Sequence, residues 1–203
     1  MNKICVFCGS SMGNRIEYSN AAKRVGEYFV DNNIELVYGG ADVGLMRIIA
    51  DVVLAGGVKV IGVMPHLLIE KEVEHKGITQ LIEVSTMAER KEKFIEISDG
   101  FIAMPGGIGT LDELVEVLIM NQLRISDKPM GILNIEGYFN SILQFFNDAV
   151  ESGFVREEHR NNLIVSDNIE ELIEKMNAYK PVVTKKWIED IKVESNGGEG
   201  LES

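Results

Sequence analysis

Short apolar runs alternate with amphipathic helical patterns along most of this 203-residue chain. The apolar runs predict strands at 3–8, 35–38, 59–64, 79–84, 100–104, 130–134 and 163–165. The helical patterns predict helices at 18–32, 45–55, 87–97, 110–124, 138–152 and 169–178. Strands that are apolar throughout and are each followed by a helix indicate a parallel sheet with both faces covered. We therefore expect an α/β protein with a three-layer, doubly wound, Rossmann-like parallel sheet.

The length and the 45% hydrophobic content favour one domain with a real core. We expect this domain to span residues 1–180. The chain becomes polar after Lys180, so 181–203 is expected to be a partly disordered tail. A short amphipathic piece around Trp187, Ile188 and Ile191 is the expected exception.

The formal net charge of −12 argues against binding to nucleic acid or to an anionic membrane surface. It also implies that a bound phosphate needs a local positive pocket. Charged residues interrupt every apolar stretch before it reaches membrane-spanning length. The apolar start at residues 4–8 lacks a long signal-peptide core and a cleavage site, and it is interpreted as the first strand. We therefore expect a cytoplasmic location.

The chain offers little for metal binding. Cys5 and Cys8 have C-x-x-C spacing, but the pair falls inside a predicted strand and no further cysteine completes a site. Two buried core thiols are the favoured interpretation. The three histidines, at positions 66, 75 and 159, show no ligand spacing. No metal site is predicted.

Three predicted strands end in loops of small residues, at 9–13, 39–44 and 105–109. Parallel strands bring such loops to one edge of the sheet, where ligands bind in doubly wound folds. The loops are expected to line one cleft, which gives Ser10, Gly40 and Asp42 their interest. The 38–44 loop does not match the dinucleotide-binding glycine pattern, and a tight strand-to-helix turn is an equal alternative for it.

The segment from Pro105 to Glu113 passes from a strand through glycines into a helix. Glycines let a backbone approach a phosphate closely, and a helix start supplies unpaired N–H groups. A capping box is the alternative, with Thr110 as N-cap and Glu113 reaching back to its backbone N–H. Because a capping box does not need three preceding glycines, the cluster favours anion binding.

The predicted helix at 87–97 points cations toward the core. At 100° per residue, Met87, Phe94 and Ile97 form the inward stripe, and Arg90 lies among them. Unpaired buried charge is costly, so Arg90 is interpreted as a donor facing phosphate, ribose or a carboxylate. Lys91 lies on the shoulder of this face, where snorkelling to solvent is as good an interpretation as function.

Two motifs at this separation, Met87 to Lys91 and Pro105 to Glu113, resemble the "lonely guy" family of cytokinin-riboside 5′-monophosphate phosphoribohydrolases. Members of this family have often been labelled putative lysine decarboxylases. The similarity runs from Ile4 to about Met176. It includes the opening 6–11, the loop 38–40 and the stretch from 128 through 143.

The resemblance implies hydrolysis of the N-glycosidic bond of a nucleoside 5′-monophosphate to a purine-type base and ribose 5-phosphate. It implies that Arg90 and Glu113 are the catalytic pair, that no cofactor is needed, and that the chain forms a homodimer or a larger homo-oligomer. The expected substrate-binding residues are Ser10, Gly40, Met87, Lys91, Gly106, Gly107, Ile108, Gly109 and Thr110. Two alternatives stay open: a general AMP nucleosidase and a non-catalytic nucleotide carrier. A decarboxylase is the least favoured enzyme, because nothing supports a pyridoxal phosphate site at Lys91.

The chain departs from the family pattern around the motifs. Ala88 replaces a common histidine, Ala41 a common glycine and Arg47 a common small residue. Met120 and Arg124 stand where a tryptophan and a glycine are usual. These changes spare the two motifs but alter the surroundings of the base, so the sequence leaves the preferred base open.

Overall fold

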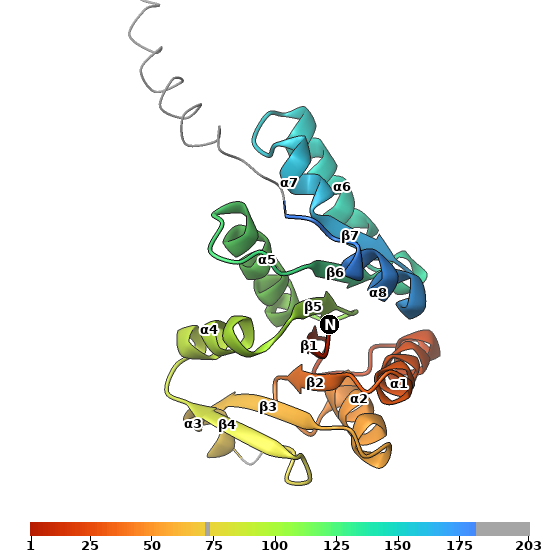
Figure 1. Ribbon diagram of the computed structural model, residues 1–203, viewed down its shortest axis with the longest axis vertical. Helices are drawn as coiled ribbons and strands as arrows, with labels where there is room; N and C mark the ends of the chain where they lie inside the picture. Colours follow the sequence, from red (N-terminus) through yellow and green to blue (C-terminus); the bar gives the residue numbers. More distant parts are fainter. Residues whose placement is uncertain (72–73, 182–203) are drawn as a thin grey trace, which may run out of the picture.

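The computed structural model describes residues 1–71 and 74–181. A seven-stranded sheet forms its centre, in the order β4-β3-β2-β1-β5-β6-β7, and every neighbouring pair is parallel (Figure 1). The strands are β1 (Lys3–Phe7), β2 (Glu35–Tyr38), β3 (Val60–Pro65), β4 (Gln80–Val84), β5 (Gly100–Ala103), β6 (Met130–Leu133) and β7 (Leu163–Ser166). Each predicted strand is therefore present, with ends that differ by at most one residue.

Helices cover both faces of the sheet, as the alternating pattern predicts (Figure 1). One face packs against α1 (Ile16–Asp31), α2 (Gly44–Ala55) and α8 (Ile169–Asn177). The other packs against α4 (Met87–Ile97), α5 (Ile108–Gln122) and α6 (Asn140–Glu151). The three-layer, doubly wound architecture is confirmed.

Alternation along β1 explains how this central strand serves two cores. Ile4, Val6 and Cys8 pack toward α1, α2 and α8, whereas Cys5 and Phe7 pack toward α4 and α5. Successive side chains of a strand point to opposite faces, so the two thiols lie on opposite sides of the sheet. Both cysteines are free and buried, and burial raises the pKa of each thiol. Both pack in the hydrophobic cores, so the C-x-x-C spacing does not bring the two thiols together on one face of the sheet.

Three short elements have no counterpart among the predicted ones. They are α3 (His66–Ile69), the single 3₁₀ turn η1 (Ile135–Gly137) and α7 (Glu157–Asn161). A helix of four or five residues shows too little periodicity to be recognised in a sequence. The amphipathic piece expected around Trp187 lies outside the described residues.

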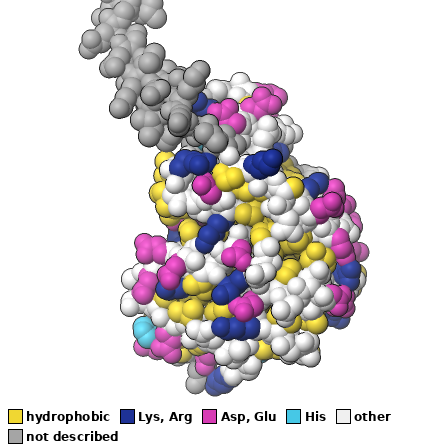
Figure 2. Space-filling model, in the orientation of Figure 1, with side chains coloured by type: hydrophobic (Ala, Val, Ile, Leu, Met, Phe, Trp, Pro, Cys, Tyr) yellow, Lys and Arg dark blue, Asp and Glu magenta, His cyan; other side chains and the backbone are white. Residues whose placement is uncertain are grey.

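Charged side chains of both signs are mixed on the visible surface (Figure 2). On the face in Figure 2, basic side chains are interspersed with acidic ones rather than gathered in one patch. Within the described residues, no helix is long and apolar enough to cross a membrane.

Candidate active site

The three small-residue loops meet at the carboxyl edge of the sheet, as expected from the parallel order. The Gly9 N–H donates to the Pro105 carbonyl over 3.0 Å, and the Leu45 N–H at the start of α2 donates to the Gly9 carbonyl over 3.1 Å. Gly44 lies so close to the first loop that a β-carbon there would be 2.4 Å from the carbonyl carbon of Ser10. Glycine allows this approach, and it also tolerates the φ of 54° at Gly44.

Helix α5 begins with backbone donors that no neighbouring side chain caps. Its N-cap is Gly107, which has no side chain to accept a hydrogen bond. The Leu111 N–H donates to the Gly107 carbonyl, so the amides of residues 108–110 precede the first bond of the helix. Unpaired amides at a helix start, together with the helix dipole, can bind an anion.

The capping-box alternative is wrong. Thr110 lies in the first turn of α5, after the N-cap, and is only 4% exposed. The helix starts two residues earlier than predicted because extended backbone at Gly107 leads directly into helical backbone at Ile108. Glu113 therefore does not reach back to cap Thr110, and its carboxylate contacts Arg90 instead.

The loops enclose a cleft with two lobes that share Ser10 and Gly107. The first, which we call the Arg90 lobe, has a volume of about 230 Å³. The Arg90 lobe is lined by Cys8, Ser10, Met46, Arg90, Gly107, Ile108, Gly109, Thr110 and Glu113. It brings the predicted catalytic pair and the start of α5 into one space.

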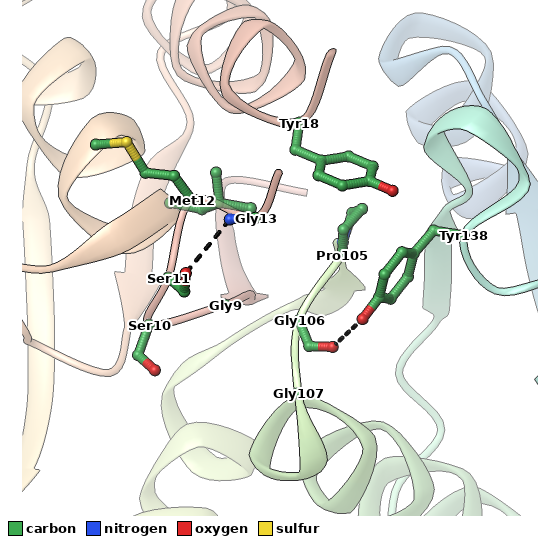
Figure 3. Close-up of a pocket in the computed structure, with 11 residues that line it drawn as sticks. Gly9, Ser10, Ser11, Met12, Gly13, Tyr18, Pro105, Gly106, Gly107 and Tyr138 are labelled. Atoms are coloured by element: carbon green, nitrogen blue, oxygen red, sulfur yellow. Dashed lines mark hydrogen bonds between the residues drawn. The ribbon is translucent and has the colours of Figure 1, made fainter. Parts of the chain in front are cut away.

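The second, the tyrosine lobe, has a volume of about 280 Å³ and is shown in Figure 3. It is lined by residues 9–13, Tyr18, Leu45, residues 105–107 and Tyr138. The rings of Tyr18 and Tyr138 meet edge to face with centroids 5.6 Å apart. The Tyr138 hydroxyl donates to the Gly106 carbonyl over 2.5 Å, which fastens the glycine loop to the turn before α6 (Figure 3).

Arg90 is held on four sides in the first half of α4. Its Nε donates to the Val63 carbonyl over 2.9 Å, and Nη2 donates to the Gly39 carbonyl over 3.4 Å. The guanidinium carbon lies 5.0 Å from the centre of the Phe94 ring. Nη1 lies 3.4 Å from Oε1 of Glu113, and the two side chains are only 11% and 14% exposed. The cation predicted to lean inward is therefore buried and paired.

The Glu113 carboxyl is poised to titrate near neutral pH. Burial raises its pKa from the ordinary 4.5 to about 7. The Arg90 guanidinium opposes this rise, Asp112 adds to it, and Lys91 opposes it more weakly. A carboxyl whose pKa is shifted by burial and by a specific cation in a cleft is typical of a catalytic group.

The structure brings most of the predicted site residues together. Ser10, Gly107, Ile108, Gly109, Thr110, Arg90 and Glu113 line the Arg90 lobe, and Gly106 lines the tyrosine lobe. A β-carbon at Gly106 would be 2.1 Å from Oγ1 of Thr110, so the loop and the helix start pack too closely for any larger residue. The glycine segment thus forms a wall of both lobes.

Three residues predicted to bind substrate, Gly40, Met87 and Lys91, lie outside both lobes. Gly40 has a φ of 82° and turns the chain after β2, where its carbonyl accepts from the His75 N–H. Met87 is 49% exposed, so its place in the inward stripe of α4 was wrong. It occupies the first turn of α4.

Lys91 has partners on α5 rather than in the cleft. Its Nζ lies 3.0 Å from a Glu116 oxygen and 3.5 Å from an Asp112 oxygen. This side chain ties α4 to α5 beside the Arg90–Glu113 pair. Its ammonium group is therefore paired with carboxylates rather than free in solvent, and its contact with the substrate stays a prediction. Asp42 likewise pairs with Arg47 at 3.8 Å and with His75 at 3.9 Å, away from the lobes.

Sequence reasoning missed several residues of the site. Tyr18 and Tyr138 line the tyrosine lobe, and Met46 lines the Arg90 lobe. The Gly137–Tyr138 step was recognised only as part of a family stretch, and no local pattern marks the tyrosines as neighbours. Within the described residues, no group of three or more His, Cys, Asp or Glu side chains is arranged to hold a metal ion.

Comparison with known proteins identifies the relatives of this chain. A family model described as "Possible lysine decarboxylase" matches residues 46–176. A cytokinin riboside 5′-monophosphate phosphoribohydrolase of Arabidopsis thaliana is 46% identical over 179 residues, which is 88% of this chain and 84% of the relative. A probable enzyme of the same name from Oryza sativa subsp. japonica is 46% identical over 190 residues, which is 91% of this chain and 78% of the relative.

Solved structures share the fold at low sequence identity. The molybdenum cofactor binding protein of Rippkaea orientalis has a TM-score of 0.65 at 20% identity, covering 87% of this chain and 95% of that one. The Moco carrier protein of Chlamydomonas reinhardtii has a TM-score of 0.63 at 17% identity, covering 87% and 97%. These likenesses concern the fold alone. The family match and the identity to the plant enzymes show more: the chain belongs to the "Possible lysine decarboxylase" family, among the cytokinin riboside 5′-monophosphate phosphoribohydrolases.

Proposed function

We propose that this protein hydrolyses the N-glycosidic bond of a nucleoside 5′-monophosphate, releasing the free base and ribose 5-phosphate. The observation that carries the proposal is the buried Arg90–Glu113 pair beside the uncapped start of α5, in one lobe. A protein that only binds a nucleotide needs the helix start but gains nothing from a buried carboxyl with a pKa of about 7. The activity named for the plant relatives agrees with this chemistry.

The helix start supplies the positioning. The 5′-phosphate accepts hydrogen bonds from the amides of residues 108–110, where the dipole of α5 favours negative charge. Holding the phosphate there places the ribose over the Arg90–Glu113 pair. Fixing the substrate in this way lowers the entropic part of the barrier.

The pair supplies the chemistry. As the C1′–N bond breaks, its electrons go to the base and the ribose develops oxocarbenium character, as in glycoside hydrolysis. The Glu113 carboxylate stabilises this positive charge and orients the water whose oxygen bonds to C1′. One proton of that water ends on the departing base, and the other remains on the new C1′ hydroxyl. Arg90 keeps a fraction of Glu113 ionised near neutral pH, because it lowers the pKa that burial raises.

The substrate of the relatives decides what is tested first. We propose a cytokinin riboside 5′-monophosphate as the preferred substrate, with AMP as the comparison. Purified protein is incubated with N6-isopentenyl AMP and with AMP while ribose 5-phosphate and free base are measured. Release from the first at a higher kcat/KM supports the proposal, and release from AMP alone favours a general nucleosidase. Tight nucleotide binding without release from either refutes the hydrolase and favours a carrier.

We also propose a homodimer in the cytoplasm. Large apolar side chains are exposed along α5 and α6, among them Ile119 at 45% and Phe145 at 62%, and Phe154 just beyond α6 is 88% exposed. Such surface is typical of an interface between subunits. Light scattering after gel filtration tests the mass, with Phe154→Asp as the variant expected to yield monomers, and cell fractionation tests the location.

A further inference from the structure

Two main-chain carbonyls, from two neighbouring strands, accept hydrogen bonds from the Arg90 guanidinium. We call the position in which they hold it the seat of Arg90. The Val63 carbonyl belongs to β3 and the Gly39 carbonyl follows β2 directly. β2 and β3 pair in parallel, so these two carbonyls lie near the same edge of the sheet. They fix the direction of the guanidinium, and the third nitrogen is thereby aimed at Glu113.

The seat also depends on an empty space above Gly39. A β-carbon at this position would lie 2.5 Å from Nη2 of Arg90 and 3.1 Å from Sδ of Met46. Real side chains essentially never approach to 2.5 Å, so any residue larger than glycine displaces the guanidinium. The fold itself tolerates such a residue, because the atoms that must move are the ends of two flexible side chains.

Backbone conformation does not explain the glycine. Gly40, the next residue, has a φ of 82°, which favours glycine whatever surrounds it. Gly39 lies outside this left-handed region, so an alanine could adopt its backbone. The space occupied by the Arg90 guanidinium is what excludes a side chain at this position.

We propose that Gly39 is a positioning residue for the hydrolytic reaction: its missing side chain leaves the seat in which two main-chain carbonyls hold Arg90 against Glu113. The proposal rests on the function proposed above. It assigns the first glycine of the 39–44 loop to the catalytic pair, although Gly39 itself lines neither lobe. The loop therefore acts on the reaction without touching the phosphate.

The consequence for Glu113 can be measured. The charged and titratable groups that face its carboxyl from the packed elements are Arg90, Lys91, Asp112, Cys5 and Cys8. Among the first three, Arg90 has the largest effect in lowering the pKa of Glu113. Moving its guanidinium away therefore raises that pKa further.

The test is Gly39→Ala in the full chain. We expect kcat to fall about a hundredfold, the effect of a misplaced catalytic group, with a smaller change in KM because the phosphate site is untouched. The pH at which activity reaches half its plateau moves upward. A Gly39→Ala enzyme with the kcat and the pH profile of the wild type overturns the proposal.

Two further variants separate positioning from packing. Gly26→Ala is the matched control, since a β-carbon there would lie 2.7 Å from the Val52 Cβ in a helix contact far from the cleft. It is expected to lower stability and to leave kcat and the pH profile unchanged. In an Arg90→Lys background the guanidinium is absent, so Gly39→Ala is expected to add little further loss. Full additivity of the two substitutions would contradict the proposal.

A readout without activity keeps this proposal distinct from the hydrolase function. The pH dependence of the unfolding free energy also reports the pKa of Glu113. If the wild type releases no ribose 5-phosphate, the hydrolase function fails, while an upward shift of this dependence in Gly39→Ala still supports the seat. An unchanged dependence overturns the seat whatever the activity.

Discussion

Replacing Glu113 by glutamine removes a carboxyl whose ionisation opposes folding. The pKa of this carboxyl rises from 4.5 to about 7 on folding, chiefly through burial. A raised pKa contributes stability that is complete below pH 4.5 and is lost as the pH rises through about 7. At 1.36 kcal/mol for each tenfold change in proton affinity, the loss by pH 8 is about 3 kcal/mol. Glutamine keeps the shape and the neutral character of the protonated form, so the variant escapes this loss.

The expected result is a stability difference that depends on pH. As the pH rises from 5 to 8, the unfolding free energy of Glu113→Gln relative to that of the wild type should increase by about 2 kcal/mol. This corresponds to roughly 5 °C in melting temperature for a domain of this size. Urea unfolding at the two pH values measures the difference. Glu116→Gln is the matched control on the same helix: its carboxylate lies 3.0 Å from Lys91, so losing it is expected to be neutral or destabilising at pH 8. A difference between Glu113→Gln and wild type that stays constant from pH 5 to pH 8 would refute the burial argument.

Three other perturbations address the reaction and the fold. The kcat/KM of the wild type should rise with pH to a plateau above about 7, because the Glu113 carboxylate is the active form, and in Arg90→Ala this rise should move to higher pH while kcat falls by about 10²-fold or more. Gly107→Asp should cap α5 and stabilise the fold by about 0.5–1 kcal/mol, yet raise KM because its carboxylate competes with the substrate phosphate for the same amides; an unchanged KM would place the phosphate elsewhere. Arg124→Gly should raise the melting temperature by about 2 °C without affecting kinetics, since Arg124 follows the C-cap of α5 with a φ of 61° that glycine adopts without strain, and the ion pair with Asp127 that is lost is exposed to solvent.

The sheet could be predicted because burial on both faces leaves a simple trace in the sequence. All four residues of β5 and of β6 are buried, and each strand reads as a continuous apolar run. Amphipathic helices such as α8, with its buried Leu172 and Ile173, are equally legible. The order of the strands leaves no such trace. Without the strand order, the sequence could not show that α4 packs over β3, where Arg90 donates a hydrogen bond to the Val63 carbonyl.

The residues of the candidate site fall into the same two groups: those that local sequence could predict and those that it could not. Residues that act through local backbone geometry, such as Gly107 and Thr110, could be placed from the sequence because the strand, the loop and the helix are continuous. Residues whose role depends on long-range partners could not. The sequence offered solvent or a ligand as the partner of the Lys91 ammonium group, whereas its observed partners, Asp112 and Glu116, lie on the neighbouring helix α5. Met87 followed the helical period, but the period alone does not show which positions along a helix the rest of the fold covers.

Several features that are unfavourable for stability occur together around the start of α5. Helix α5 starts without a side-chain cap, a carboxyl and a guanidinium are withdrawn from water beside it, and Gly106 packs where a β-carbon cannot fit. Each feature costs stability, and a cap at Gly107 or a neutral residue at Glu113 is expected to recover part of that cost. Conflicts of this kind cluster where function selects against stability. In the proposed reaction the exposed backbone donors bind the substrate phosphate and the buried carboxyl faces the developing cation, so the destabilising features are the ones that this reaction would use.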